Sequence, residues 1–115
     1  MSRTEILLLR GEAYAWIGDR KQARHDYEIA LATGAAGDRA AQWQAMMRLS
    51  ASWSEGDHPK ALRYAEEALA LADAEGDAPA TAHSLNRLGN FAIFAGQPFE
   101  AERYHAQALA IFASL

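Results

Sequence analysis

The stretch GQPFEAERYHAQALA, residues 96–110, occurs in related form twice more in the same chain. GDHPKALRYAEEALA spans residues 56–70, and GDRKQARHDYEIALA spans residues 18–32. Each copy begins with Gly, has Ala five residues later, and carries Ala-Leu-Ala seven residues after that Ala. The copies stand 38 and then 40 residues apart. Because a regular period of this size is typical of stacked supersecondary units, this repeat decides the fold.

The composition favours an all-α chain that forms a single domain, residues 1–115. Half of the residues are hydrophobic, and Ala, the strongest helix former, supplies much of that share. Pro is scarce, with three residues, and β-branched residues are few. A chain of 115 residues can bury one modest core. Since Ala is small, we expect that core to depend on close contact between helices.

Gly and Asp residues at the start of the repeated stretches indicate where helices end and begin. Gly18, Gly56 and Gly96 stand where a helix must stop, because Gly accepts the left-handed conformation that ends helices. Asp19 and Asp57 follow two of them and suit the N-cap of the next helix. We therefore expect six helices, near residues 3–17, 20–33, 39–55, 58–75, 79–95 and 98–113.

Small residues recur where two helices of a pair are expected to touch. Ala23, Ala61 and Ala101 allow the second helix of each pair to approach the first. Gly11 and Gly89 remove a side chain from the first helix where such an approach needs it. The residues four positions after these alanines lie on the same helix face: Tyr27, Ala65 and His105.

This pattern resembles the tetratricopeptide repeat family, whose unit reads roughly W-x2-L-G-x2-Y and then Gly, Ala, an aromatic residue and Ala. The first copy matches at Gly11 and Tyr14, and the third at Leu88 and Gly89. The second copy departs from the pattern, since its first helix has Leu49 where Gly is expected.

The resemblance implies three tandem helix-turn-helix repeats stacked as a right-handed superhelix, at about residues 4–37, 38–77 and 78–115. The family's common period is about 34 residues. The longer period of this chain is similar to that of kinesin light chains and of sensor arrays in bacterial regulators. HEAT-type repeats share the period, but the Gly and Ala marks favour tetratricopeptide repeats.

Repeats of this family line a concave groove with their first helices, and the groove holds a partner's peptide. The resemblance thus implies a non-enzymatic protein–protein interaction module, a scaffold or adaptor. The alternative is a sensor or regulatory segment of a larger bacterial transcription regulator or signalling ATPase. The groove positions, carried over residue by residue, are Glu5, Leu8, Glu12, Trp16, Trp43, Met46, Ser50, Trp53, His83, Asn86, Asn90 and Phe94.

Two readings stay open for the three tryptophans, which all fall in this set. Each can either anchor a partner in the groove or pack between repeats, because Trp at helical spacing serves both purposes. For the partner itself, Glu5 and Glu12 favour an apolar or basic segment over an acidic one. The formal charge of −4 argues against a nucleic acid, whose phosphates favour a basic surface.

No residue pattern indicates catalysis, a cofactor or a bound metal. The chain has no Cys, which excludes disulfides and thiol chemistry and fits a cytoplasmic protein. Its four His are scattered at positions 25, 58, 83 and 105, without the spacing of metal ligands. The apolar runs are far too short to span a membrane.

The end of the last expected helix, AIFASL at residues 110–115, has no polar capping segment after it. Solenoids need such caps, because a terminal unit otherwise exposes a face meant for a neighbour. Either the chain is an excerpt of a longer array, or its ends associate with another copy. We expect Phe112 and Leu115 to be partly exposed and to support a homo-oligomer.

Overall fold

The computed structural model describes residues 2–34 and 37–115. The chain forms two compact units. Unit 1 is Met1–Tyr64 and unit 2 is Ala65–Leu115. Residues 1, 35 and 36, which fall in the predicted domain and its first repeat, lie outside the described residues.

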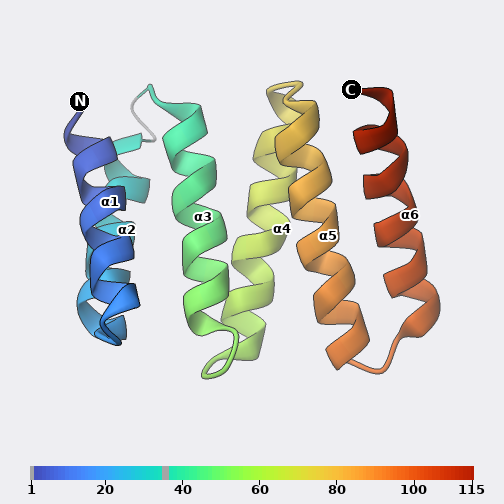
Figure 1. Cartoon of the computed structure of the whole chain (residues 1–115), viewed down its shortest axis with the longest axis horizontal. Coiled ribbons are helices and arrows are strands. Elements are labelled where there is room, and N and C mark those ends of the chain that lie inside the picture. Colours follow the sequence, from blue (N-terminus) through green and yellow to red (C-terminus); the bar gives the residue numbers. More distant parts are fainter. Residues whose placement is uncertain (1, 35–36) are drawn as a thin grey trace. The chain divides into compact units, whose positions relative to one another are not determined.

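The described residues form six α-helices and no strand (Figure 1), which confirms the predicted all-α class. Most observed ends lie within one or two residues of the predicted ends, because local capping signals set them. The helices are α1 (Arg3–Trp16), α2 (Arg20–Gly34), α3 (Arg39–Trp53), α4 (His58–Ala74), α5 (Ala78–Phe94) and α6 (Pro98–Ser114).

Aspartate side chains begin four of these helices. Each carboxylate accepts a hydrogen bond of 3.0 or 3.1 Å from the backbone N–H three residues later. Such a bond satisfies one of the N–H groups that the first turn of a helix leaves without a partner. The predicted caps of α2 and α4 are therefore confirmed, and α3 and α5 begin with caps of the same kind. The capping residues are Asp19, Asp38, Asp57 and Asp77.

The helix-ending glycines adopt two different turns. Gly18 and Gly96 have φ angles of 86° and 71°, in the left-handed region that favours Gly. Gly56, for which the sequence predicted the same conformation, has no positive φ, so that prediction was wrong. The chain leaves α3 through a turn in which the N–H of Asp57 donates to the carbonyl of Trp53, four residues earlier, at 2.9 Å. After Gly18 and Gly96 the corresponding bond spans five residues.

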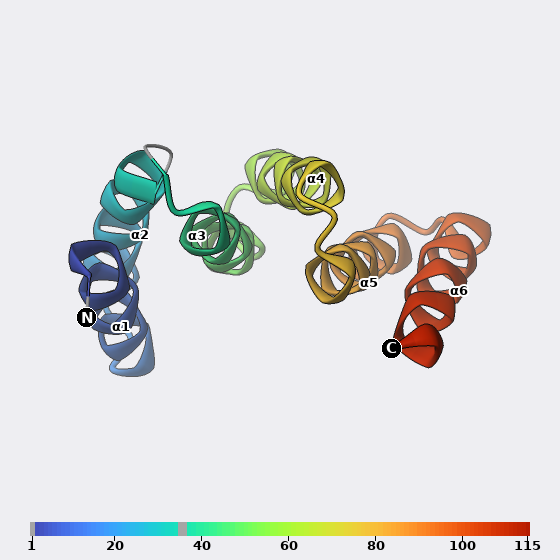
Figure 2. The same ribbon diagram turned by 90° about the horizontal axis from the view of Figure 1, so that it is seen from above.

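In unit 1, α1 and α2 lie side by side as an antiparallel pair (Figure 2), and α3 packs against them. The two helices approach closely at Gly11, where a Cβ atom would lie 2.6 Å from Cε1 of Tyr27. Real Cβ atoms essentially never come so close to another atom. The ring of Tyr27, which is 3% exposed, thus occupies the space of the missing side chain. This confirms the predicted role of Gly11.

A buried ion pair also joins α1 to α2. The Nε and Nη2 atoms of Arg10 donate to both carboxylate oxygens of Asp26, each at 2.8 Å. Asp26 is fully buried, whereas the side chain of Arg10 remains about half exposed. The hydrogen bond and the charge of Asp26 raise the pKa of Arg10. Since a buried carboxylate without a partner is costly, this pair aligns the two helices at one register.

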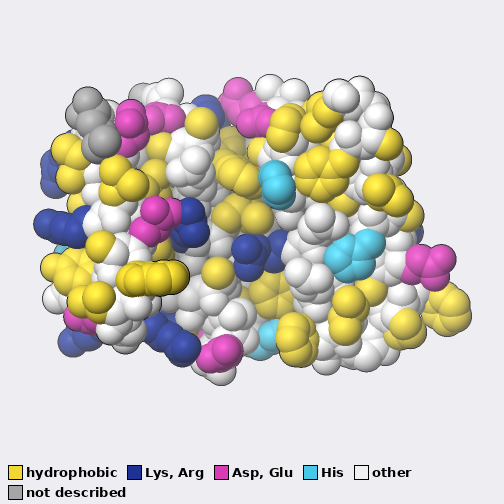
Figure 3. Space-filling model, viewed as in Figure 1, with side chains coloured by type: hydrophobic (Ala, Val, Ile, Leu, Met, Phe, Trp, Pro, Cys, Tyr) yellow, Lys and Arg dark blue, Asp and Glu magenta, His cyan; other side chains and the backbone are white. Residues whose placement is uncertain are grey.

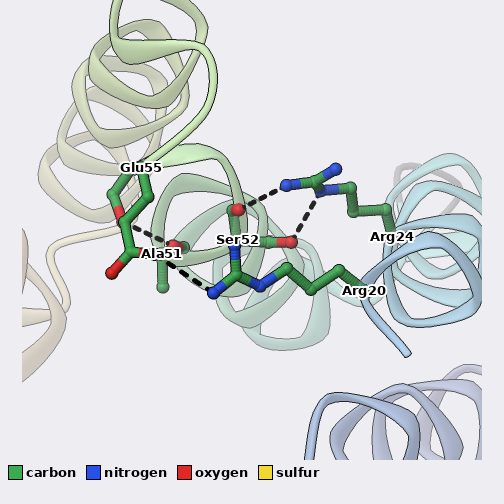
Figure 4. Close-up of polar contacts among 6 residues, drawn as sticks. Arg20, Arg24, Ala51, Ser52 and Glu55 are labelled. Atoms are coloured by element: carbon green, nitrogen blue, oxygen red, sulfur yellow. Dashed lines mark hydrogen bonds and ion pairs between the residues drawn. The ribbon is translucent and has the colours of Figure 1, made fainter. Parts of the chain in front are cut away.

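Arginines of α2 hold the end of α3 (Figure 4). Arg24 donates through Nε to the Ser52 hydroxyl at 2.8 Å and through Nη2 to the Ser52 carbonyl at 2.6 Å. That carbonyl lies in the last turn of α3, where carbonyl groups lack helical partners. The exposed pair of Arg20 and Glu55, at 3.1 Å, lies beside it.

Unit 2 contains the second part of α4 with the antiparallel pair α5 and α6. Gly89 repeats the role of Gly11, because a Cβ atom there would lie 2.6 Å from Nε2 of His105. The Nδ1 atom of the same ring lies 3.0 Å from Oδ1 of Asn86. The predicted close approach at Gly89 is thus confirmed as well. Buried residues at the centre of this unit are Ala82, Leu85 and Ala108.

We expect Gly11→Leu to lower the free energy of unfolding by about 3 kcal/mol, because the new side chain must displace the Tyr27 ring. Tyr27→Ala alone is expected to cost about 3–5 kcal/mol through a cavity. The double substitution is expected to cost at least about 1 kcal/mol less than the two single costs together. Urea denaturation of the four proteins measures this coupling.

The control for this cycle is Ala13→Leu, on an exposed position of the same helix. It is expected to change the stability by less than about 0.5 kcal/mol. Strictly additive costs for Gly11 and Tyr27 would show that the two positions do not share one space.

Stability is expected to decline at alkaline pH because of Tyr27. Burial raises the pKa of Tyr27 above its ordinary value of 10.0; the charge of Arg48 opposes this shift, and the charges of Glu12 and Asp26 add to it. Between the two pKa values the unfolded chain has lost a proton that the folded chain keeps, so the free energy of unfolding falls as pH rises. The contribution is complete below pH 10. Urea denaturation from pH 8 to pH 11 should show a shallower decline in Tyr27→Phe, and equal slopes would contradict the assignment.

Candidate partner-binding surface

A groove runs between α1 and α3 within unit 1, and we name it the α1–α3 groove. Its volume is about 440 Å³. The floor is apolar and the rim carries carboxylates. Its lining residues are Glu5, Leu8, Leu9, Glu12, Asp38, Ala40, Ala41 and Gln44.

One face of α1 continues the groove toward the end of the helix. Glu5, Leu9, Glu12 and Trp16 follow one another at intervals of four, three and four residues, so they share a face. Leu9 is 51% exposed and Trp16 is 91% exposed. The face thus alternates acidic and large apolar side chains, and we name these four residues the α1 stripe.

The charge of the α1–α3 groove is negative. Of the described residues, those that line it include three carboxylates and no Lys or Arg. Glu12 is paired with Arg48, which stands beside the groove, and Figure 3 shows acidic and basic side chains side by side over α1 and α3. The Asp38 carboxylate caps α3, and Glu5 accepts a hydrogen bond of 3.2 Å from the Ser2 hydroxyl. Arg48 therefore offsets only part of the negative charge.

The residues predicted on α3 lie differently from those predicted on α1. Met46 and Ser50 are buried, and the Ser50 hydroxyl donates to the Ala61 carbonyl at 2.8 Å. Trp43 is half-buried. Leu8 on α1 is also buried, although its edge lines the groove. The side chains that α3 gives to the groove are Ala40, Ala41 and Gln44, which the sequence analysis missed.

Trp53 lies between two cations. The guanidinium of Arg24 is 3.7 Å from the centre of its ring, and the ammonium of Lys60 is 4.2 Å from it. Such stacking attracts the cation to the electron-rich face of the ring. The indole Nε1 atom of Trp53 is buried and has no hydrogen-bond partner among the described residues. Trp53 thus joins α2, α3 and the start of α4 within unit 1.

The residues predicted on α5 divide into two groups in unit 2. Asn86 is hydrogen-bonded to His105, and the ring of His83 meets the edge of Phe112 at a centroid distance of 5.1 Å. Asn90 and Phe94 are exposed, and Phe94 is 85% exposed. These last two side chains are accessible at the end of α5.

The two residues expected to support self-association differ in exposure. Leu115 is 68% exposed, whereas Phe112 is half-buried against the core of unit 2. In residues 2–34 and 37–115, no three His, Asp or Glu side chains come close enough to hold a metal ion. Nor does any helix in this part of the chain have the length and apolar character that crossing a membrane requires.

Two tryptophan substitutions separate packing from surface roles. Trp53→Ala is expected to lower the free energy of unfolding by about 3 kcal/mol, because it removes a ring stacked between Arg24 and Lys60. Trp16→Ala, at a site 91% exposed, is expected to change it by less than about 0.5 kcal/mol. Urea denaturation measures both, and equal losses would refute the distinction.

Comparison with known proteins agrees with this arrangement. The family model described as tetratricopeptide repeat matches residues 50–114, more than half of the chain. A solved structure, the TPR domain of Arabidopsis FLU, aligns over 97% of this chain and 96% of its own length with a TM-score of 0.84. At 18% sequence identity, this second likeness concerns the fold alone. No curated protein matches the sequence. The repeated helix pairs and the family match together show that the chain belongs to the tetratricopeptide repeat family.

Proposed function

We propose that this chain is a non-enzymatic interaction module that binds a basic, partly apolar segment of a partner protein along α1. Tetratricopeptide repeats generally serve as protein–protein interaction modules. The observation that carries the finer proposal is the α1–α3 groove together with the α1 stripe. Both combine unshielded apolar surface with carboxylates.

The apolar part supplies the affinity in this proposal. Leu9 and Trp16 expose large side chains at 51% and 91%, and a partner that covers them removes apolar area from water. That burial stabilises a complex by about 25 cal/mol for each Å². Trp is also among the residues that most often dominate the energetics of an interface. Trp16 therefore serves as the main anchor.

The carboxylates select a partner by the sign of its charge. Glu5 and Glu12 border the same groove as Leu9, and none of the described lining residues is basic. A Lys or Arg of the partner gains attraction there, whereas an Asp or Glu is repelled. Charges at the rim of an interface affect the association rate and its salt dependence most strongly. The partner segment is thus basic rather than acidic.

On α5, Asn90 and Phe94 offer a further contact within unit 2. Phe94 is exposed to 85%, and Asn90 presents an amide one helical turn before it. Met46 and Ser50, being buried, support α3 from within instead of reaching a partner. The likeness to kinesin light-chain repeats, the cytoplasmic location and self-association through Phe112 and Leu115 stay predictions.

Selection from a displayed peptide library tests the proposal, with the intact chain as bait. We expect peptides enriched in Lys, Arg and apolar residues. For a selected peptide, Trp16→Ala and Glu5→Lys are each expected to weaken binding about tenfold, as measured by fluorescence anisotropy. Raised salt should weaken binding to the wild type more than binding to Glu5→Lys.

The matched control is Glu102→Lys, which makes the same change of charge on an exposed position of α6. It should leave the affinity within about twofold of the wild type, because Glu102 is not among the residues that line the α1–α3 groove. Equal selection of acidic peptides, or equal effects of Glu5→Lys and Glu102→Lys, would reject the proposed surface.

A further inference from the structure

A second groove lies within unit 2 and involves other helices. It is bordered by the second part of α4, by α5 and by α6, and its volume is about 730 Å³. All of its lining residues lie between Glu66 and Ile111, so none is shared with the α1–α3 groove. We name it the unit 2 groove.

The unit 2 groove is apolar at its base. Leu85 and Leu88 of α5 line it and are almost fully buried. Leu69 of α4 and Ile111 of α6 line it from the two sides and are half-buried. Apolar side chains of a docked segment would therefore meet apolar partners on three helices.

Two carboxylates stand on the α4 side of this groove. Glu66 and Asp73 flank Leu69 at intervals of three and four residues, so the three share one helix face. Both acids are exposed. Within the described residues, neither carboxylate has a hydrogen bond or an ion pair with another side chain. Their negative charge is therefore available to a ligand.

No described residue that lines the unit 2 groove is basic. The guanidinium of Arg103 lies 5.8 Å from the centre of the Tyr104 ring, which does line the groove. That guanidinium is already paired with Glu100 at 2.7 Å. The groove thus joins an apolar base to a negative border, and the described residues that line it include no cation to neutralise that border.

We propose that the unit 2 groove docks an amphipathic helix of a partner protein, with an apolar stripe and two Lys or Arg residues beside it. Glu66 and Asp73 are seven residues apart, which is two helical turns or about 10 Å. Basic residues seven positions apart on a docked helix have the same separation. The helix lays its apolar stripe on Leu85 and Leu88 while its two cations reach the carboxylates.

Two other occupants fit the charge less well. A small apolar molecule would leave both carboxylates without partners. A second copy of this chain, docking through its exposed α6, would bring Glu100 and Glu102 toward an already negative border. This inference goes beyond the proposed function, because it assigns a second partner site to α4, α5 and α6 within unit 2, and either site can exist without the other.

A designed peptide probe tests the proposal on the whole chain. The probe is a fluorescent helix of about 18 residues, built from Leu, Lys and Ala with Leu on one face and Lys seven positions apart. A second probe replaces its Lys by Glu, and a third has the same composition in scrambled order. We expect the first probe to bind at least about tenfold more tightly than the other two.

Two variants locate the bound probe. Glu66→Lys with Asp73→Lys should weaken the basic probe about tenfold and favour the acidic one. The matched control, Glu67→Lys with Glu102→Lys, makes the same change of charge at exposed positions outside the groove and should have little effect. Ala110→Trp, on an exposed lining position, should block the basic probe by filling the groove. Circular dichroism checks that each variant keeps its helices.

Several outcomes would overturn the inference. They are equal binding of the basic and acidic probes, equal effects of the two double variants, and unchanged binding in Ala110→Trp. Loss of the basic probe in Trp16→Ala would place it on α1 instead, which would support the proposed function and reject the unit 2 site. A dimer that sedimentation detects and that Ala110→Trp abolishes would assign the groove to a second copy.

Discussion

The distance between paired helices in this chain depends on one missing atom, the Cβ of a glycine. Gly11 accommodates the ring of Tyr27, and Gly89 accommodates that of His105, each within 3 Å of where a Cβ would stand. At the corresponding positions of the second predicted repeat, the sequence has Leu49 and Ala65, so the large residue has moved to the first helix. In both observed pairs the ring of one helix fills the space that Gly leaves in the other, in keeping with the dense packing of protein interiors.

This close approach also determines which side chains remain outside. The Ala-rich faces of the helices are buried in the contacts between helices: Ala23, Ala30 and Ala45 are at most 1% exposed. Small residues fill such narrow spaces, so larger apolar residues of the first helices are left at the surface. Trp16 and Phe94 are examples, exposed to 91% and 85%. An Ala-based core therefore leaves large apolar residues at the surface without weakening the packing that holds the helices.

The sequence predicted those features that depend on neighbouring residues. Helix ends and aspartate caps involve residues within four positions of each other, so capping rules reach them. The surroundings of Trp53 depend on Arg24, which is 29 positions earlier, and no local pattern connects the two. The sequence did not predict the burial of Met46 and Ser50. Their positions on α3 were inferred from the family pattern, and the second repeat has Leu49 where that pattern has Gly. The unit 2 groove needs three helices, and periodicity along one helix does not reveal it.

The two grooves combine the same ingredients but should respond differently to a cationic partner. In the α1–α3 groove, Glu12 already has Arg48 as a partner and Asp38 caps a helix, so an incoming cation competes with existing contacts. In the unit 2 groove, no such contact occupies the described carboxylates of Glu66 and Asp73. When an incoming cation replaces an existing exposed ion pair, the free energy of binding changes little. When the carboxylate had no earlier partner, the whole attraction of the new pair, although modest, favours binding. The proposed binding to unit 1 would therefore rely more on Trp16 and apolar burial, and the proposed binding to unit 2 would rely more on charge.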